Sequence, residues 1–295
     1  MPTNYYSALL LFFIALIWGG SFIIVKESLT VLSPLAVIAL RFTLAFCFLF
    51  LVYRRTVGRH WRTTLRPGFG LGIILTLAFA TQTIGLKFTT PSVSALLTGM
   101  NGIFVALLEA FFYQKKPALL SLLGLITATF GLALITWPSS ARQLQLNPGV
   151  LLTLACALFF AWHIVATSRA VTRYNPQTLT VIQFAVVALT AWCFAPPGIP
   201  SLHLKLQTWG ALFYLGLLAT AIAFLCQSVA QRRITPVMTA VILATEPAFA
   251  TLFSIVFGYE PLTWKLVLGA FFMISGIILS AVGESFRGEV GKMIP

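Results

Sequence analysis

The sequence has few charged residues: 8% of its 295 positions are Asp, Glu, Lys or Arg, whereas soluble globular proteins use about 25%. Apolar residues make up 59%. No stretch between apolar runs is long enough to form a soluble domain, and the longest covers residues 54–67. These deficits exclude an ordinary soluble protein and predict an all-α polytopic membrane protein.

Cysteine is also scarce. The four residues, Cys47, Cys156, Cys193 and Cys226, lie within or at the edge of apolar runs, so nothing suggests a disulfide or metal framework. The chain lacks a Walker loop, a cluster of metal ligands and a nucleophile triad. We therefore expect no cofactor, no metal, no enzyme activity and no ATP-driven transport by this chain alone. No lysine or arginine precedes the first apolar run, as a cleavable signal peptide would require, so we expect that run to remain as a span.

The apolar runs are long enough for helical spans, which need about 18 residues or more. A transmembrane barrel would instead show alternating segments of about ten residues. Breaks at charged residues, prolines and glycines predict ten transmembrane helices, at residues 7–29, 35–53, 67–86, 91–113, 118–137, 148–171, 176–195, 208–231, 236–258 and 262–283.

The net charge of +13 comes from basic residues between the spans rather than from one soluble face, so we expect no nucleic-acid partner. If the chain starts inside the cell, thirteen of the nineteen lysines and arginines fall on the cytoplasmic side, five fall outside, and Arg41 lies within a span. This bias predicts that both termini are cytoplasmic. The arginine-rich loop at 54–66 is mainly an orientation signal, with binding of anionic lipids as a second role.

An internal repeat divides the chain into halves at about 1–140 and 145–295. Because each half has five spans, an odd number, the second half must enter the membrane from the opposite side. Inverted repeats are common in secondary transporters, whose substrate site lies near the midplane between the repeats. Residues that recur 145 positions later include Gln82 as Gln227, Pro91 as Pro236, Gly124 as Gly269, and Gly131 as Gly276.

Polar and aromatic residues within the spans also fall at related positions, as a central cavity between two halves would require. We take them as candidates for substrate binding or ion coupling. The pairs are Arg41 with Gln183, Gln82 with Gln227, Trp18 with Trp162, and Asn101 with Glu246.

Glu246 is followed by Pro247 in the middle of the ninth span. A carboxylate at that depth costs at least ~2.5–3.5 kcal/mol and by default marks a pathway. The proline removes a backbone hydrogen bond and clashes with the carbonyl of Leu243, so we expect a hinge there. The structural alternative is a carboxylate that bonds to the backbone freed by Pro247.

Two further intramembrane residues have two readings each. Arg41 could hold a substrate carboxylate in a bidentate fork, or it could be the fixed counter-ion of Glu246 or another acid. His163 has an ordinary pKa near 6.5 and suits a proton-coupled cycle, or it could be an interhelical hydrogen-bonding residue.

The remaining candidates also have structural alternatives. Trp18 and Trp162 could line an aromatic cavity or simply pack, and Gln82, Gln227, Gln183 and Asn101 could face a ligand or bond across helices. We expect Glu109 to reach the interface and pair with Lys115 or Lys116. Heptad-spaced glycines on the fifth and tenth spans are better explained by close helix packing; these are Gly124, Gly131, Gly269, Gly276 and Gly283.

Several motifs resemble one known family. The first span reads LIWGGSFIIVKESL, the second LSPLAVIALRF, and the ninth ILATEPAFATLFSIVFGYEPLT. Over essentially the whole chain the sequence is similar to EamA-type members of the drug/metabolite transporter superfamily. The resemblance implies two inverted five-helix repeats around a central cavity, and export of small metabolites, often amino acids or toxic compounds, across a bacterial inner membrane. One departure is that Tyr113-Gln114-Lys115 stands where a Gly-Glu pair is expected.

We therefore expect a multi-pass secondary transporter that exports amino-acid-like or amphiphilic metabolites, with proton exchange through Glu246 or His163 as one form of coupling. Its partners would be a small-molecule substrate and the lipid bilayer, and a homodimer is left open. A channel or facilitator is a second hypothesis, although scattered single polar groups do not make the continuous ring that a channel needs. An intramembrane enzyme using His163 with Glu246 is a third.

Overall fold

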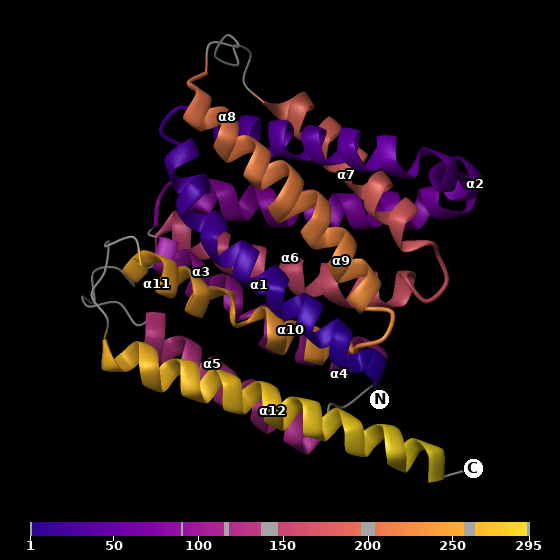
Figure 1. The fold of residues 1–295 in the computed structure, drawn as a ribbon, viewed down its shortest axis with the longest axis vertical. Helices are drawn as coiled ribbons and strands as arrows, with labels where there is room; N and C mark the ends of the chain where they lie inside the picture. The colour runs from indigo at the N-terminus through magenta and orange to yellow at the C-terminus, as the bar shows by residue number, and fades with distance from the viewer. Residues whose placement is uncertain are drawn as a thin grey trace.

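The computed structural model describes residues 2–293 apart from 90, 115–117, 137–146, 196–203 and 257–262. In this part every regular element is helical and no strand is present (Figure 1), as expected for the all-α class. In chain order the elements are α1 (Pro2–Ser28), α2 (Pro34–Gly85), α3 (Pro91–Gly99), α4 (Asn101–Tyr113), α5 (Leu119–Thr136), α6 (Pro148–Ala170), α7 (Pro176–Phe194), α8 (Leu206–Phe213), η2 (Tyr214–Ile222), α9 (Ala223–Ala230), α10 (Pro236–Leu243), α11 (Glu246–Val256) and α12 (Trp264–Met293).

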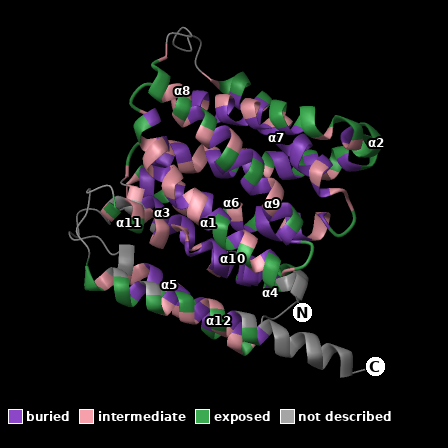
Figure 2. Cartoon of the chain, in the orientation of Figure 1, coloured by how far each residue is buried: buried purple, intermediate pink, exposed green. Residues whose placement is uncertain are grey.

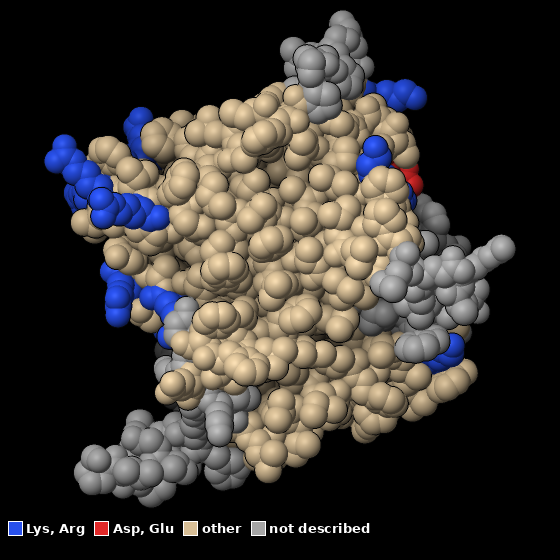
Figure 3. All heavy atoms as spheres, turned by 180° about the vertical axis from the view of Figure 1, so that it is seen from behind, with Lys and Arg blue, Asp and Glu red and all other residues tan. Residues whose placement is uncertain are grey.

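The surface has the character of a protein that sits in lipid. Five helical segments are long and apolar enough to cross a membrane: 5–28, 34–85, 148–170, 176–194 and 206–230. On the face seen in Figure 3, charged side chains gather at two opposite edges and the surface between them is uncharged. Large apolar side chains, including Phe130, Phe271 and Ile274, are exposed on α5 and α12 (Figure 2). Because lipid favours such a belt, the chain is a multi-pass membrane protein.

Four helices begin with the same local signal. In each, a capping side chain just before a proline accepts a hydrogen bond from a backbone N–H of the first turn, and the proline fits there because that position needs no N–H donor. The caps are Ser33 before α2, Asn147 before α6, Asn175 before α7 and Thr235 before α10.

The second and third predicted spans form one element, α2, because helical structure continues through the arginine-rich stretch 54–66 that we expected to be a loop. A straight helix would separate Phe42 from Phe79 by roughly 55 Å. Their ring centroids lie 4.9 Å apart, so α2 folds back on itself, as its two arms in Figure 1 show. The folded helix packs most extensively against α7.

The fourth and ninth predicted spans are each broken in the middle, although we expected a hinge only at Pro247 in the ninth. One helix ends at Leu243 and the next begins at Glu246, as the clash of Pro247 with the Leu243 carbonyl explains. The equivalent break separates Gly99 from Asn101, and no proline lies there. Asn101 and Glu246 are therefore both first residues of a half-helix.

The eighth predicted span also departs from a regular helix. Between α8 and α9 the chain forms the π-helical turn η2, in which the hydroxyl of Thr220 donates to the carbonyl of Leu215 at 2.7 Å. Such widened turns leave backbone carbonyls free to accept other donors and are frequent at functional sites. Here the Ala219 carbonyl accepts from the indole Nε1–H of Trp18 at 2.8 Å.

Helices α5 and α12 lie against each other along their glycines. A Cβ added to Gly124 would lie 2.5 Å from the carbonyl oxygen of Gly276, and one added to Gly131 would lie 2.5 Å from that of Gly269. A Cβ on Gly283 would meet the backbone of Ser121 at 2.7 Å. The expected packing glycines thus all lie at this one interface, where the two backbones approach too closely for any side chain.

Candidate functional site

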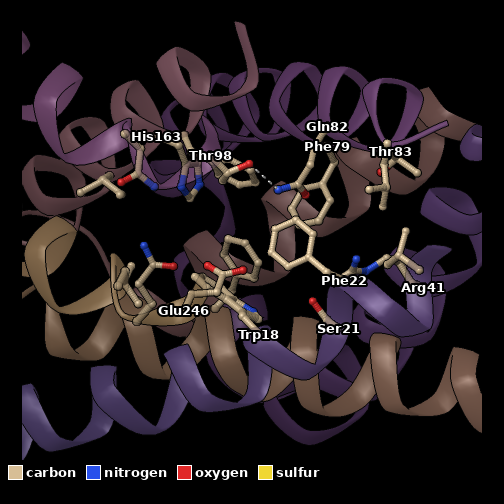
Figure 4. Close-up of a pocket in the computed structure, with 18 residues that line it drawn as sticks. Trp18, Ser21, Phe22, Arg41, Phe79, Gln82, Thr83, Thr98, His163 and Glu246 are labelled. Atoms are coloured by element: carbon tan, nitrogen blue, oxygen red, sulfur yellow. Dashed lines mark hydrogen bonds between the residues drawn. The ribbon is translucent and has the colours of Figure 1, made fainter. Parts of the chain in front are cut away.

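A cavity lies among the helices, with about 690 Å³ of atom-free space including its mouth. Figure 4 shows its walls, which come from both halves of the chain. Aromatic side chains supply much of the lining, and polar and charged side chains interrupt it. The lining residues are Trp18, Ser21, Phe22, Val25, Arg41, Phe79, Gln82, Thr83, Leu86, Thr98, Asn101, Phe160, His163, Ile164, Phe224, Gln227, Leu243 and Glu246.

Glu246 lines the cavity at the first residue of α11. The helix break before Pro247 positions it there, and a carboxylate is favoured at a helix N-terminus by the helix dipole. Among the described residues the half-buried carboxylate forms no ion pair and no hydrogen bond, and the ion pair found there joins Glu109 to Arg169. The alternative in which Glu246 bonds to freed backbone does not occur in this part of the structure.

Three neutral side chains of the cavity also carry buried polar atoms that have no partner. They are Asn101 Oδ1, Gln227 Oε1 and His163 Nδ1. Their residues are at most 9% exposed. Because buried polar atoms in native proteins are nearly always hydrogen-bonded, these cavity atoms are available to bind a ligand or water.

His163 is held in position by a residue outside the cavity. Its Nε2 lies 2.8 Å from Oε1 of Gln183 on α7, and its ring meets the ring of Phe224 edge-on. Since the amide oxygen can only accept, this contact places the proton of neutral His163 on Nε2 and leaves Nδ1 as an acceptor. Gln183 is fully buried and does not line the cavity, so it orients His163 rather than facing a ligand.

Arg41 reaches the cavity from α2. Its Nε donates to the Thr220 hydroxyl at 2.8 Å, and its guanidinium carbon lies 4.7 Å from the ring centroid of Phe79. Its Nη2 also reaches the Ala219 carbonyl at 3.5 Å, so η2 and an aromatic ring fix the guanidinium. Within the described residues Arg41 has no acidic partner, so the alternative in which it is the fixed counter-ion of Glu246 does not occur there.

The two tryptophans that the repeat relates lie in different environments. Trp18 lines the cavity, with its ring centroid 5.1 Å from that of Phe224. Trp162 is 49% exposed and absent from the cavity lining, contrary to our expectation. Successive residues on a helix point about 100° apart. Because His163 points into the cavity, the adjacent Trp162 points away from it.

Both cavity glutamines, Gln82 and Gln227, were predicted from the sequence, but the aromatic residues Phe79 and Phe224 beside them were not. Gln82 donates from Nε2 to the Thr98 hydroxyl at 3.3 Å, the dashed contact in Figure 4. Phe79 and Phe224 lie three positions before Gln82 and Gln227, on the same helix faces, and they are themselves 145 positions apart. The repeat offset could therefore have identified them.

Glu109 has a different partner from the one we expected. Its carboxylate forms an ion pair with the guanidinium of Arg169 at 2.6 Å, which joins α4 to α6. We expected Lys115 or Lys116, which lie outside the described residues, as does the motif Gly258-Tyr259-Glu260. The sequence could not reveal the pair because its members are sixty positions apart.

No group of three His, Cys, Asp or Glu side chains in the described ranges could hold a metal ion. What the cavity offers is a carboxylate and a guanidinium that are not paired with each other, unpartnered acceptors and aromatic walls. These groups can bind a small polar molecule with an apolar body, by charge and by stacking.

Comparison with known proteins shows which family the chain belongs to. The EamA-like transporter family matches residues 6–137 and 147–282. An "Uncharacterized transporter" of Archaeoglobus fulgidus is 30% identical over 93% of this chain and 85% of its own length. A "Probable amino-acid metabolite efflux pump" of Salmonella typhimurium is 25% identical, over 93% of this chain and 94% of its own. A solved crystal structure shares the fold, with a TM-score of 0.76 at 21% identity, over 94% of this chain and 97% of that chain.

Proposed function

Because the chain belongs to the EamA-like transporter family, we propose that it is a secondary transporter that exports amino-acid-like or amphiphilic metabolites by alternating access. The observation that carries this proposal is the cavity itself, which holds Arg41 and Glu246 without pairing them. Relatives named as probable amino-acid metabolite efflux pumps support the substrate class. A zwitterionic substrate would satisfy both charges at once.

The proposed architecture is ten crossings in two inverted five-helix repeats, 1–140 and 145–295. The crossings are α1, the two arms of α2, α3 with α4, α5, α6, α7, α8 with η2 and α9, α10 with α11, and α12. The exchange of glycine contacts supports a two-fold relation, since Gly124 meets Gly276 while Gly131 meets Gly269.

A second exchange of contacts also supports this architecture. A Cβ on Gly72 would lie 3.0 Å from the carbonyl oxygen of Gln183, and a Cβ on Gly216 would lie 3.1 Å from that of Arg41. These are the same contact made once by each half, because Gln183 is the repeat partner of Arg41.

Closure at one end of the bundle supports alternating access. The cavity is lined by the C-terminal half of α1 and the last turns of α2, whereas Leu11 and Ile14 of α1 are packed in the core. At the C-terminal ends of α4 and α6, the Glu109–Arg169 pair and a hydrogen bond from Arg232 Nε to the Val171 carbonyl join the helices. We assign this closed end to the cytoplasm of a bacterial inner membrane, because the arginine-rich stretch of α2 lies at the same end.

Energy coupling by protons is part of the proposal. Glu246 and His163 are the two titratable groups of the cavity that could load and release a proton within it. An imposed pH gradient should then drive uphill movement of the substrate in vesicles. If the pH gradient drives no uphill movement, the protein is a facilitator and not a proton-coupled transporter.

The test is flux in vesicles that contain the purified protein, measured with a panel of labelled amino acids and aromatic amines. We expect saturable flux that Glu246→Gln and Arg41→Ala each reduce by roughly tenfold or more, since each removes a charge-assisted contact. The exposed residues Glu27 and Arg54 provide matched controls, Glu27→Gln and Arg54→Ala. Undiminished flux in both cavity variants would remove these residues from the mechanism, and electrical currents through an open state would indicate a channel.

A further inference from the structure

Resting on the proposed function, we propose that Glu246, Asn101, Gln227 and His163 form a subsite for the ammonium group of an aromatic substrate. The four side chains come from four helices and line one cavity. Two of them, Asn101 and Glu246, begin the half-helices at the two helix breaks.

The buried polar atoms of this subsite that lack a partner are acceptors, although Asn101 and Gln227 also carry amide donors. Asn101 Oδ1, Gln227 Oε1 and His163 Nδ1 are buried without a donor among the described residues, and the half-buried carboxylate of Glu246 forms no ion pair there. Gln227 is 2% exposed and His163 1% exposed, so a donor can reach their unpartnered acceptors only from within the cavity. A ligand that fits must therefore bring donors, and it must bring positive charge to match Glu246.

An ammonium group meets both requirements, because it carries one positive charge and three N–H donors. A divalent metal ion fits less well, since Mg²⁺ and Ca²⁺ need six or more oxygen ligands and usually several carboxylates. The described part of the subsite offers one carboxylate, and no group there qualifies as a metal site.

The rest of the cavity indicates the body of the ligand. Figure 4 shows His163 and Glu246 toward one end and Arg41 toward the other, with Phe22 and Phe79 between them. Trp18 and Phe224 stand beside the subsite, with ring centroids 5.1 Å apart. Aromatic faces attract cations and stack on aromatic rings, so an aromatic amine fits the space.

Three probes separate the contributions of the ammonium group, the carboxylate and the aromatic ring to binding. Phenethylamine has the ammonium and the ring, 3-phenylpropionate has the carboxylate and the ring, and phenylalanine has all three groups. Calorimetric titration of the full chain in detergent gives each Kd. We expect Glu246→Gln to weaken phenethylamine and phenylalanine by roughly tenfold to a hundredfold, the effect of one hydrogen bond to a charged group. The Kd of 3-phenylpropionate should stay within about twofold, as should every Kd in the control Glu27→Gln.

A second variant, Gln227→Leu, removes an acceptor without changing charge and should weaken phenethylamine selectively but less than Glu246→Gln. Equal thermal unfolding temperatures would show that the variants are folded. The inference is overturned if the wild-type chain does not bind phenethylamine, if its Kd is the same in Glu246→Gln, or if all three probes weaken equally.

Flux in vesicles distinguishes this inference from the proposed function. Glu246-dependent binding of phenethylamine without transport of any panel compound would keep the subsite and contradict export. Saturable, cavity-dependent transport with phenethylamine binding that ignores Glu246 would keep the transporter and overturn the subsite.

Discussion

The two charges of the cavity come from different halves of the chain, and in the proposed repeat each corresponds to a neutral residue. Glu246 corresponds to Asn101, and Arg41 corresponds to Gln183. The structure adds that Gln183 bonds to His163, whereas Arg41 bonds to η2. Residues at corresponding positions of the proposed repeat thus make different contacts. The cavity has a carboxylate toward one end and a guanidinium toward the other.

Arg41 should not tolerate replacement by lysine. Arg41→Lys keeps the charge but loses the planar fork and the contact with the Phe79 ring, so the KM for a carboxylate-bearing substrate should rise roughly tenfold. Arg54→Lys, at an exposed position, serves as the control. Saturable flux measured over a range of substrate concentrations checks this prediction. An unchanged KM would mean that Arg41 serves the fold alone.

Individual site residues could be predicted from the sequence where a side chain is energetically unfavourable inside a membrane span. An ionisable side chain inside an apolar run is conspicuous, so Glu246, Arg41 and His163 were identified as candidates, and the cavity includes all three. Aromatic residues are ordinary in membrane helices, and Phe79, Phe160 and Phe224 gave no such signal. Trp162 failed for a different reason, because spacing along the chain does not say which of two neighbours points inward.

At the scale of helices, the glycine interface between α5 and α12 leads to a stability prediction. In Gly276→Ala the new methyl would lie 2.5 Å from the carbonyl oxygen of Gly124, and backbone must move to admit it. We expect a loss of about 1–3 kcal/mol in the free energy of unfolding, as for other overpacked sites. Thermal or denaturant unfolding in detergent measures it.

The control for this substitution is Gly70→Ala on α2, where a Cβ would meet nothing within 4 Å. This variant should be neutral or slightly stabilising, because alanine is the better helix former. Equal stability of the two variants would contradict the close packing of α5 on α12.

The ion pair between α4 and α6 leads to a second prediction at this scale. In a double-mutant cycle, Glu109→Gln and Arg169→Gln should couple by roughly 0.5–3 kcal/mol. The lower part of that range is expected, since the side chain of Arg169 is 35% exposed and water screens the pair. Additive effects of the two substitutions on unfolding would show that the pair does not tie the helices together.

Helix starts were predictable and helix breaks only partly so. Prolines that follow Ser, Asn or Thr fixed the beginnings of α2, α6, α7 and α10, because the cap and the proline act locally. Pro247 predicted one break. The break before Asn101 and the π-helical turn η2 have no local cause in the sequence, so they depend on packing with the other helices.

For the whole molecule, the central claim is that both halves enclose one cavity and expose it alternately to the two sides of a membrane. The exchange of glycine contacts supports two related halves, and the Glu109–Arg169 pair joins α4 of one half to α6 of the other. A transporter of this kind carries substrate in both directions through the same site, whereas a channel does not couple the two directions.

Counterflow tests this claim most directly. Vesicles containing the purified protein are preloaded with an unlabelled substrate, and uptake of the labelled compound from outside is followed. The account predicts a transient accumulation of label above equilibrium, which Glu246→Gln abolishes and Glu27→Gln preserves. Uptake that rises only to equilibrium, at a rate that does not saturate and does not depend on Glu246, would contradict it.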